Sequence, residues 1–204
     1  MVKAKKRVLF VEGGGDQNPS LASECRRAFS MLFERAGVKR RPKVVACGGR
    51  KRAFDQFCVA LAEAKDDVWL LVDAEEPVAG ASFDPWAHVK ARPGDGWERP
   101  GAATDEQLHL MTVTMETWLV ADRAALTAVF GSKLDASKLP AEGAALETKT
   151  KAAINTALQQ ATKPTKAGPY GKGAHSFKVL AQVSPDKLRA LAWGQRLLDA
   201  MGAS

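Results

Sequence analysis

Two short apolar runs, each ended by a carboxylate, constrain the fold of this 204-residue chain more than any other feature. In RVLFVEGGGDQN, residues 7–18, the apolar residues Val8 to Val11 lead into Glu12 and three glycines. DDVWLLVDAEEP repeats this design, with Asp73 after the apolar run. A short apolar run closed by glycine or proline predicts a buried strand. Both runs therefore indicate strands whose ends carry a charge.

The segments around these strands have helical and strand periodicity in alternation. Apolar residues recur at helical spacing over residues 20–36 and 51–64, and a short strand is expected at 44–46. Strand, helix, strand, helix, strand is typical of right-handed βαβ units in an α/β protein. We expect a Rossmann-like, mostly parallel sheet flanked by helices. A further strand at 109–116 should lead into a helix over 117–130.

The rest of the chain is expected to organise around this sheet. Residues 1–131 should form the α/β core, in which the Gly-, Pro- and Trp-rich residues 77–104 form a long loop over the edge of a site. Residues 132–146, with Pro140, should be a linker. Residues 147–204 should form a helical C-terminal extension that packs on the core.

Composition narrows the environment and the partner. The net charge is +7, and basic residues cluster near Lys3–Arg7, Lys39–Lys43, Arg50–Arg52 and Lys149–Lys178. Such clusters favour a polyanion such as nucleic acid, because phosphate contacts release counterions. A solvated basic face without such a partner is the alternative. The apolar stretches fall short of the ~18–20 residues of a membrane span, so we expect a cytoplasmic protein with no membrane partner. Cys25, Cys47 and Cys58 are isolated from one another and form no CxxC pair, so we expect them to be reduced.

The carboxylates after the strands predict a metal site. Glu12, Asp73 and Glu116 each follow an apolar strand, and Glu75 would point to the same side as Asp73 if the strand continued. The carboxyl ends of parallel strands share one edge of the sheet, where α/β proteins bind ligands. Converging carboxylates repel one another unless a cation lies between them, and Mg²⁺ or Mn²⁺ accepts such oxygen ligands. An acid after a strand more often only caps a helix or faces solvent, which is the alternative.

The motifs in this order resemble a known domain. VLFVEGGGD followed by WLLVDAEEP resembles the TOPRIM domain of topoisomerases, primases and overcoming-lysogenization-defect nucleases. METWLVAD and YGKGAHSFKVLAQVSPDKLR are similar to segments of a family of small TOPRIM-like proteins catalogued as a domain of unknown function. The resemblance spreads over nearly the entire chain and implies a TOPRIM-like fold.

The resemblance also implies roles for individual residues. Glu12 would act as acid or base or through the metal, Asp73 and Glu75 would ligate Mg²⁺, and Lys172 would meet a phosphate. Glu116 matches an acid of the small family's own motif, as does Asp122. The chain departs from the TOPRIM pattern in that Glu75 stands where aspartate is usual, which leaves the metal's position and number open.

Other residues are interpreted from their surroundings. Arg50, Lys51 and Arg52 open a helix, where the helix dipole favours acids, so we expect them to contact nucleic-acid phosphates. Trp118 and His109 are expected in the core. His175, close to Lys172 in a glycine-rich turn, is a candidate phosphate contact.

These observations lead to a first hypothesis and two alternatives. The first is a Mg²⁺-dependent nuclease, or a related phosphoryl-transfer enzyme, that acts on DNA or RNA with Glu12, Asp73, Glu75, Glu116 and Lys172 in its site. The resemblance adds a setting in bacterial defence beside a partner ATPase. The alternatives are a non-catalytic nucleic-acid-binding or regulatory subunit of such a complex and a small-molecule phosphatase or nucleotide-binding enzyme.

Overall fold

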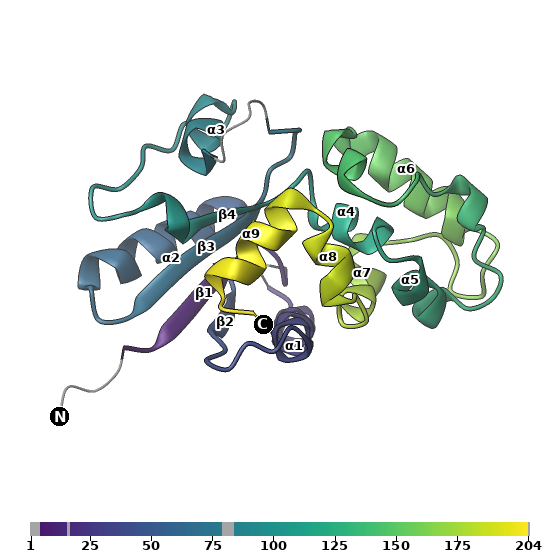
Figure 1. Cartoon of the computed structure of the whole chain (residues 1–204), viewed down its shortest axis with the longest axis horizontal. Coiled ribbons are helices and arrows are strands. Elements are labelled where there is room, and N and C mark those ends of the chain that lie inside the picture. The colour runs from purple at the N-terminus through teal and green to yellow at the C-terminus, as the bar shows by residue number, and fades with distance from the viewer. Residues whose placement is uncertain (1–4, 16, 79–83, 204) are drawn as a thin grey trace.

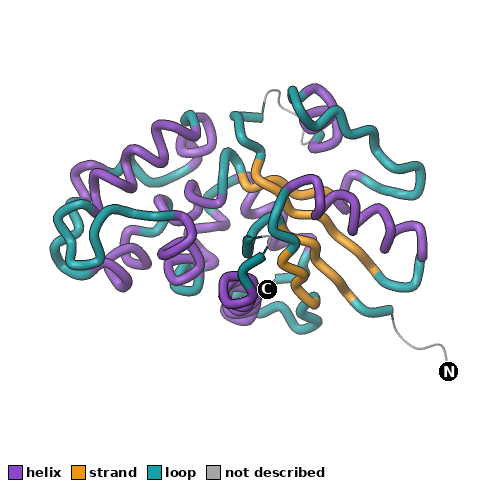
Figure 2. Tube along the Cα trace, turned by 180° about the vertical axis from the view of Figure 1, so that it is seen from behind, coloured by secondary structure: helices purple, strands orange, loops and turns teal. Residues whose placement is uncertain are grey.

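A four-stranded parallel sheet forms the frame of the protein in the computed structural model, which describes residues 5–15, 17–78 and 84–203. The strand order is β2-β1-β3-β4, and the strands are β1 (Arg7–Val11), β2 (Lys43–Ala46), β3 (Asp67–Asp73) and β4 (Leu108–Met111). The expected α/β fold with a parallel sheet flanked by helices is confirmed. Figure 1 shows the strands at one end of the molecule and α4–α7 at the other, and Figure 2 shows the same division from behind.

Helices cover both faces of the sheet. Successive side chains of a strand point to opposite faces, so apolar runs without alternation, like those of β1 and β3, supply both cores. Leu9 and Leu71 belong to the core on the side of α1 (Pro19–Arg35). Phe10 and Leu70 belong to the core on the side of α2 (Arg50–Glu63) and α3 (Pro85–Ala91).

The second half of the chain is helical. Its helices are α4 (Met115–Val120), α5 (Arg123–Phe130), α6 (Lys151–Thr162), α7 (Lys172–Leu180), α8 (Pro185–Arg189) and α9 (Ala192–Ala200). They share the core on the α1 side, where Trp118 is fully buried as expected. The segment 132–146 contains the short 3₁₀ helix Ala136–Lys138, and a second, Ala144–Thr148, begins in it. Lys3 of the first basic cluster and residues 79–83 of the long loop lie outside the described residues.

The expected strand at 109–116 and helix at 117–130 are corrected in detail. β4 ends at Met111, and Val113 N donates to Thr117 Oγ1 at 3.1 Å, which turns the chain into α4. The single helix is two, α4 and α5, because Asp122 has extended backbone angles and its side chain accepts a hydrogen bond from Ala125 N. Glu116 therefore lies in the first turn of α4 and not at a strand end.

Membrane-spanning segments and cysteines were also compared with the expectations. Within the described parts of the chain, no helix combines the length and the apolarity that crossing a membrane requires. Cys25, Cys47 and Cys58 are free thiols.

His109 connects the edge strand β4 to the C-terminal helix α9. It is fully buried, and its Nδ1 lies 3.1 Å from Arg196 Nη1 and its Nε2 3.1 Å from Glu106 O. Because arginine only donates hydrogen bonds, Nδ1 accepts and Nε2 carries the proton. Burial and the Arg196 charge lower the pKa of His109 to about 3. The expected core role of His109 is confirmed, and the ring is neutral.

This buried neutral ring predicts an acid-sensitive fold. The folded state resists protonation of His109, so its contribution to stability is complete above the unfolded pKa of about 6.5 and is lost as the pH falls toward about 3. Below pH 6.5, the free energy of unfolding, measured by urea denaturation, should fall with pH more steeply in the wild type than in His109→Gln. The difference between the two slopes should be up to about 1.4 kcal/mol for each pH unit. Parallel pH curves for the two proteins would contradict this.

Candidate functional site

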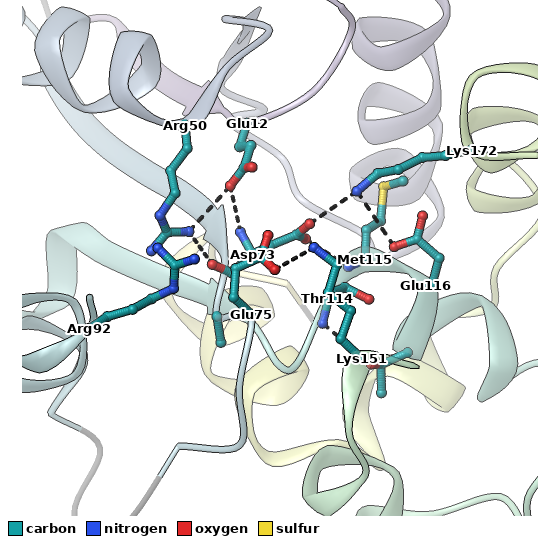
Figure 3. Close-up of polar contacts among 12 residues, drawn as sticks. Glu12, Arg50, Asp73, Glu75, Arg92, Thr114, Met115, Glu116, Lys151 and Lys172 are labelled. Carbon is teal, nitrogen blue, oxygen red and sulfur yellow. Dashed lines mark hydrogen bonds and ion pairs between the residues drawn. The ribbon is translucent and has the colours of Figure 1, made fainter. Parts of the chain in front are cut away.

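Three carboxylates meet at the carboxyl edge of the sheet. Glu12 directly follows β1, Asp73 ends the neighbouring strand β3, and Glu75 lies two residues further. Each offers a carboxylate oxygen, and these oxygens all lie within 4.8 Å of one another. Figure 3 shows the three side chains directed toward one another. The structure thus brings together the residues for which the sequence predicts metal ligation.

Glu75 reaches this cluster by a turn rather than by continuation of the strand. β3 ends at Asp73, and Glu75 has a φ of 70°, in the left-handed region that non-glycine residues rarely occupy. Its backbone N–H donates to Val113 O at 2.6 Å, which holds the turn. A side chain placed by a strained backbone is characteristic of functional sites.

Asp73 is fixed by hydrogen bonds of both its side chain and its backbone. Its Oδ1 accepts a hydrogen bond from Met115 N at 2.8 Å, and its own N–H donates to Glu12 Oε2 at 3.0 Å. Burial raises the pKa of Asp73, Lys172 opposes this rise, and the charges of Glu12 and Glu116 add to it. Burial also raises the pKa of Glu12, against the opposing charge of Arg50. Both acids therefore lie where an added cation would stabilise their ionised forms.

A separate cation contacts each of the three carboxylates. The pairs are Glu12 with Arg50 at 3.3 Å, Asp73 with Lys172 at 3.2 Å, and Glu75 with Lys151. These three cations are the first residues of α2, α7 and α6. A cation at a helix N-terminus is disfavoured by the helix dipole, so local helix stability does not explain this arrangement. The acid cluster supplies the compensating charge.

Lys172 has a second acidic neighbour, which a tyrosine holds. Its Nζ lies 3.7 Å from Glu116 Oε2, and Tyr170 donates from its hydroxyl to Glu116 Oε1 at 2.9 Å. Burial would lower the pKa of Lys172, but Asp73 and Glu116 outweigh it and raise this pKa, so the ammonium stays charged. Burial and Glu116 raise the pKa of Tyr170, which remains a neutral donor.

Arg50 is held by protein groups on all sides of its guanidinium. Nε and Nη2 donate to the Asp95 carboxylate at 2.8 and 2.6 Å, while Nη1 donates to Glu12 and to Asp73 O. The guanidinium also lies 4.9 Å from the ring centre of Trp97. Asp95 and Trp97 both come from residues 77–104, which were expected as a long loop but contain the helix α3. This segment therefore reaches the edge of the site, as expected. The expected nucleic-acid contact of Arg50 remains a prediction.

The other two residues of this basic cluster point elsewhere. Lys51 pairs with Asp55 at 2.9 Å on the solvent side of α2, where its side chain is 80% exposed. Arg52 is also exposed. Their predicted contact with phosphates would therefore occur on the surface of α2.

Asp122 and His175 bond to backbone near the site. Asp122 caps α5 and accepts a second hydrogen bond from Ser184 N at 2.8 Å. His175 accepts from Gly171 N at 3.0 Å, which fixes the start of α7. The Asp122 contact joins the start of α5 to the start of α8, and only the His175 contact acts on the helix that begins with Lys172.

A cavity of about 220 Å³ opens beside Glu12 and Asp73. Its other walls come from the glycines after β1 and β2, from α7 and from apolar side chains, namely Gly13, Gly14, Gly15, Leu21, Gly48, Met115, Lys172, Gly173, Ser176 and Phe177. Pockets for drug-sized ligands measure ~300–1,000 Å³. This cavity is therefore sized for a small group rather than for a complete dinucleotide.

Three residues of the site were not predicted from the sequence. Tyr170 lies in the motif YGKGAHSF, beside the lysine that the resemblance singled out. Lys151 follows a threonine that caps α6, in a stretch with several lysines, and Asp95 lies in a loop without periodicity. Tyr170 had a signal in the lysine two residues later. Lys151 belongs to the basic cluster Lys149–Lys178, which did not single it out, and Asp95 had no signal.

Comparison with known proteins places the whole site within one family. A family model described as Domain of unknown function (DUF4276) matches residues 11–202, a range that includes Glu12 and Lys172. No curated protein matches the chain significantly, and neither does any solved structure.

The network around Arg50 predicts a structural cost for its removal. Arg50→Met would leave Asp95, whose side chain is 4% exposed, with only Arg92 as a cation, at 3.0 Å, and would leave Glu12 without the contact to Arg50. We expect a loss of about 3 kcal/mol in the free energy of unfolding, as for other broken buried ion pairs, measured by urea denaturation. Arg52→Met, the exposed control on the same helix, should change it by less than about 0.5 kcal/mol. Equal losses in both variants would contradict this role of Arg50.

Proposed function

The chain belongs to the DUF4276 family, a domain of unknown function, and we propose from its site that it is a metal-dependent nuclease or related phosphoryl-transfer enzyme acting on nucleic acid. One observation carries the proposal. Glu12, Asp73 and Glu75 place carboxylate oxygens within 4.8 Å of one another at the carboxyl edge of a parallel sheet, which is where α/β proteins bind ligands.

The donor set fits a hard divalent cation. All three groups offer carboxylate oxygens, the ligands that Mg²⁺ and Mn²⁺ prefer, and Glu12, Asp73 and Glu75 would hold the ion. Bound there, the metal would polarise a phosphoryl oxygen and stabilise the leaving oxygen. The raised pKa values of Glu12 and Asp73 support this assignment, because a cation relieves the cost of burying two ionised acids.

The remaining polar groups have complementary roles in the proposal. Lys172 keeps its charge at neutral pH, and its side chain is 58% exposed beside the cavity, so it can bind a phosphate oxygen. Glu116 and Tyr170 orient Lys172 from the buried side. Glu12 has one of two roles: it ligates the ion with Asp73 and Glu75, or, where those two alone hold the ion, it is the general base for the attacking water.

Nucleic acid is the proposed substrate because the chain has a net positive charge and because its motifs follow one another as in TOPRIM domains. The net charge of +7 favours a polyanion, and the sequence resemblance to TOPRIM domains points the same way. With that resemblance we propose a cytoplasmic protein that works in bacterial defence with a partner ATPase. DNA and RNA are both candidate substrates.

A second function has its own supporting observation. Each carboxylate of the cluster already contacts a cation of the protein. This balance of charge favours a non-catalytic nucleic-acid-binding or regulatory subunit that folds around the same residues without a metal.

Cleavage of labelled single- and double-stranded DNA and RNA distinguishes the two functions. With Mg²⁺ or Mn²⁺, we expect products from the wild type, none with EDTA, and a loss of at least about 100-fold in Glu12→Gln and Asp73→Asn. Glu76→Gln, an exposed neighbour of Glu75, is the matched control and should retain activity.

Circular dichroism would verify that both variants fold. Unchanged cleavage in both would refute the enzyme hypothesis. Absence of products together with absence of metal binding in calorimetry would favour the binding subunit.

A further inference from the structure

Lys151 is the cation of the site that no sequence motif indicated. Its ammonium pairs with Glu75, the metal-ligand candidate on the left-handed turn. Thr150 caps the helix by accepting a hydrogen bond from Ala153 N at 3.2 Å, and Ile154 and Leu158 are fully buried in the core. The backbone of Lys151 is therefore fixed by a packed helix, and only its side chain is free to move.

The three cations of the site divide into two kinds. The side chain of Arg50 is 12% exposed and is tied to Asp95, whereas those of Lys151 and Lys172 are 39% and 58% exposed. Figure 3 shows Arg50 on one side of Asp73 and both lysines on the other. Arg50 thus has the character of a fixed structural cation, and the two lysines can change partners.

The position of Lys151 has a cost within its own helix. It is the first residue of α6, whose first turn begins Lys-Ala-Ala, so the positive end of the helix dipole faces the ammonium without an acid of that turn. Glu75 offsets this cost while its charge is available. An anion brought between the starts of α6 and α7 would offset it equally well.

Glu75 cannot give its full charge to an ammonium and to a divalent cation at once. We propose that Lys151 is a phosphate-binding residue of the site, which pairs with Glu75 in the metal-free protein and moves to a substrate phosphate when Glu75 ligates metal. This inference rests on the proposed function, and it names a contact that the acid cluster and Lys172 alone do not supply. It predicts opposite effects of one substitution on two kinds of binding.

The first effect is on metal binding without substrate. Titration calorimetry with Mn²⁺ and with Ca²⁺ should show Lys151→Met binding the ion roughly three- to tenfold more tightly than the wild type, since a competing positive charge is gone. Lys163→Met removes the same charge at the far end of α6, about 18 Å away at 1.5 Å per residue. That control should leave the metal affinity unchanged, because its charge is screened over this distance.

The second effect is on nucleic-acid binding. Fluorescence anisotropy with labelled DNA and RNA oligonucleotides should show Lys151→Met binding roughly three- to tenfold more weakly in Ca²⁺, with the salt slope reduced by about one. In EDTA the same variant should bind like the wild type, because Lys151 is then engaged by Glu75. Lys151→Arg should retain most of the Ca²⁺-dependent binding.

The outcomes separate this inference from the function on which it rests. Tighter metal binding together with metal-dependent loss of nucleic-acid binding would establish the exchange. Unchanged or weaker metal binding in Lys151→Met and in Lys151→Gln, both verified as folded, would overturn it while leaving the metal site intact, as would an equal loss of nucleic-acid binding in EDTA. A wild type that binds no metal, or no nucleic acid in Ca²⁺, would overturn the proposed function as well.

Discussion

Repulsion among three carboxylates at one sheet edge is the constraint around which this structure is arranged. Glu12, Asp73 and Glu75 lie close together, and burial makes the ionised form of the first two less favourable. Three cations, each at the start of a helix, pair with these acids and offset their negative charge. The sheet fixes the acids and the helices bring the cations, so the two halves of the chain are held together at this site by charge as well as by their shared core.

That division explains why the helical half packs where it does. Two of the cations, Lys151 and Lys172, begin α6 and α7, and Asp73 also accepts a hydrogen bond from Met115 at the start of α4. Three helices of the second half thus start at the acid cluster and run away from it. Arg50 connects the cluster to Asp95, so the segment between β3 and β4 is bound to the same charges.

The sequence was informative where apolar residues formed a short continuous run that ended at an acid. The apolar runs of β1 and β3 predicted the sheet, and the acids after them predicted the cluster of Glu12 and Asp73. Glu75 was expected to join these acids by continuation of the strand. A left-handed turn brings it there instead, so its location was predicted but the backbone conformation was not. Glu116 was expected at a strand end, whereas Thr117 accepts the hydrogen bond that turns the chain into α4. Lys151 and Asp95 could not be predicted, because their pairing depends on contacts between segments far apart in the chain.

The placement of the cations also has a consequence for the order in which the site is assembled. The three carboxylates and Arg50 all lie before residue 76, and Lys151 and Lys172 lie in the last third of the chain. A growing polypeptide therefore presents the acids, with one of their three counter-charges, long before the two lysines emerge. During synthesis, the negative charge of the acids is therefore only partly neutralised until α6 and α7 have emerged.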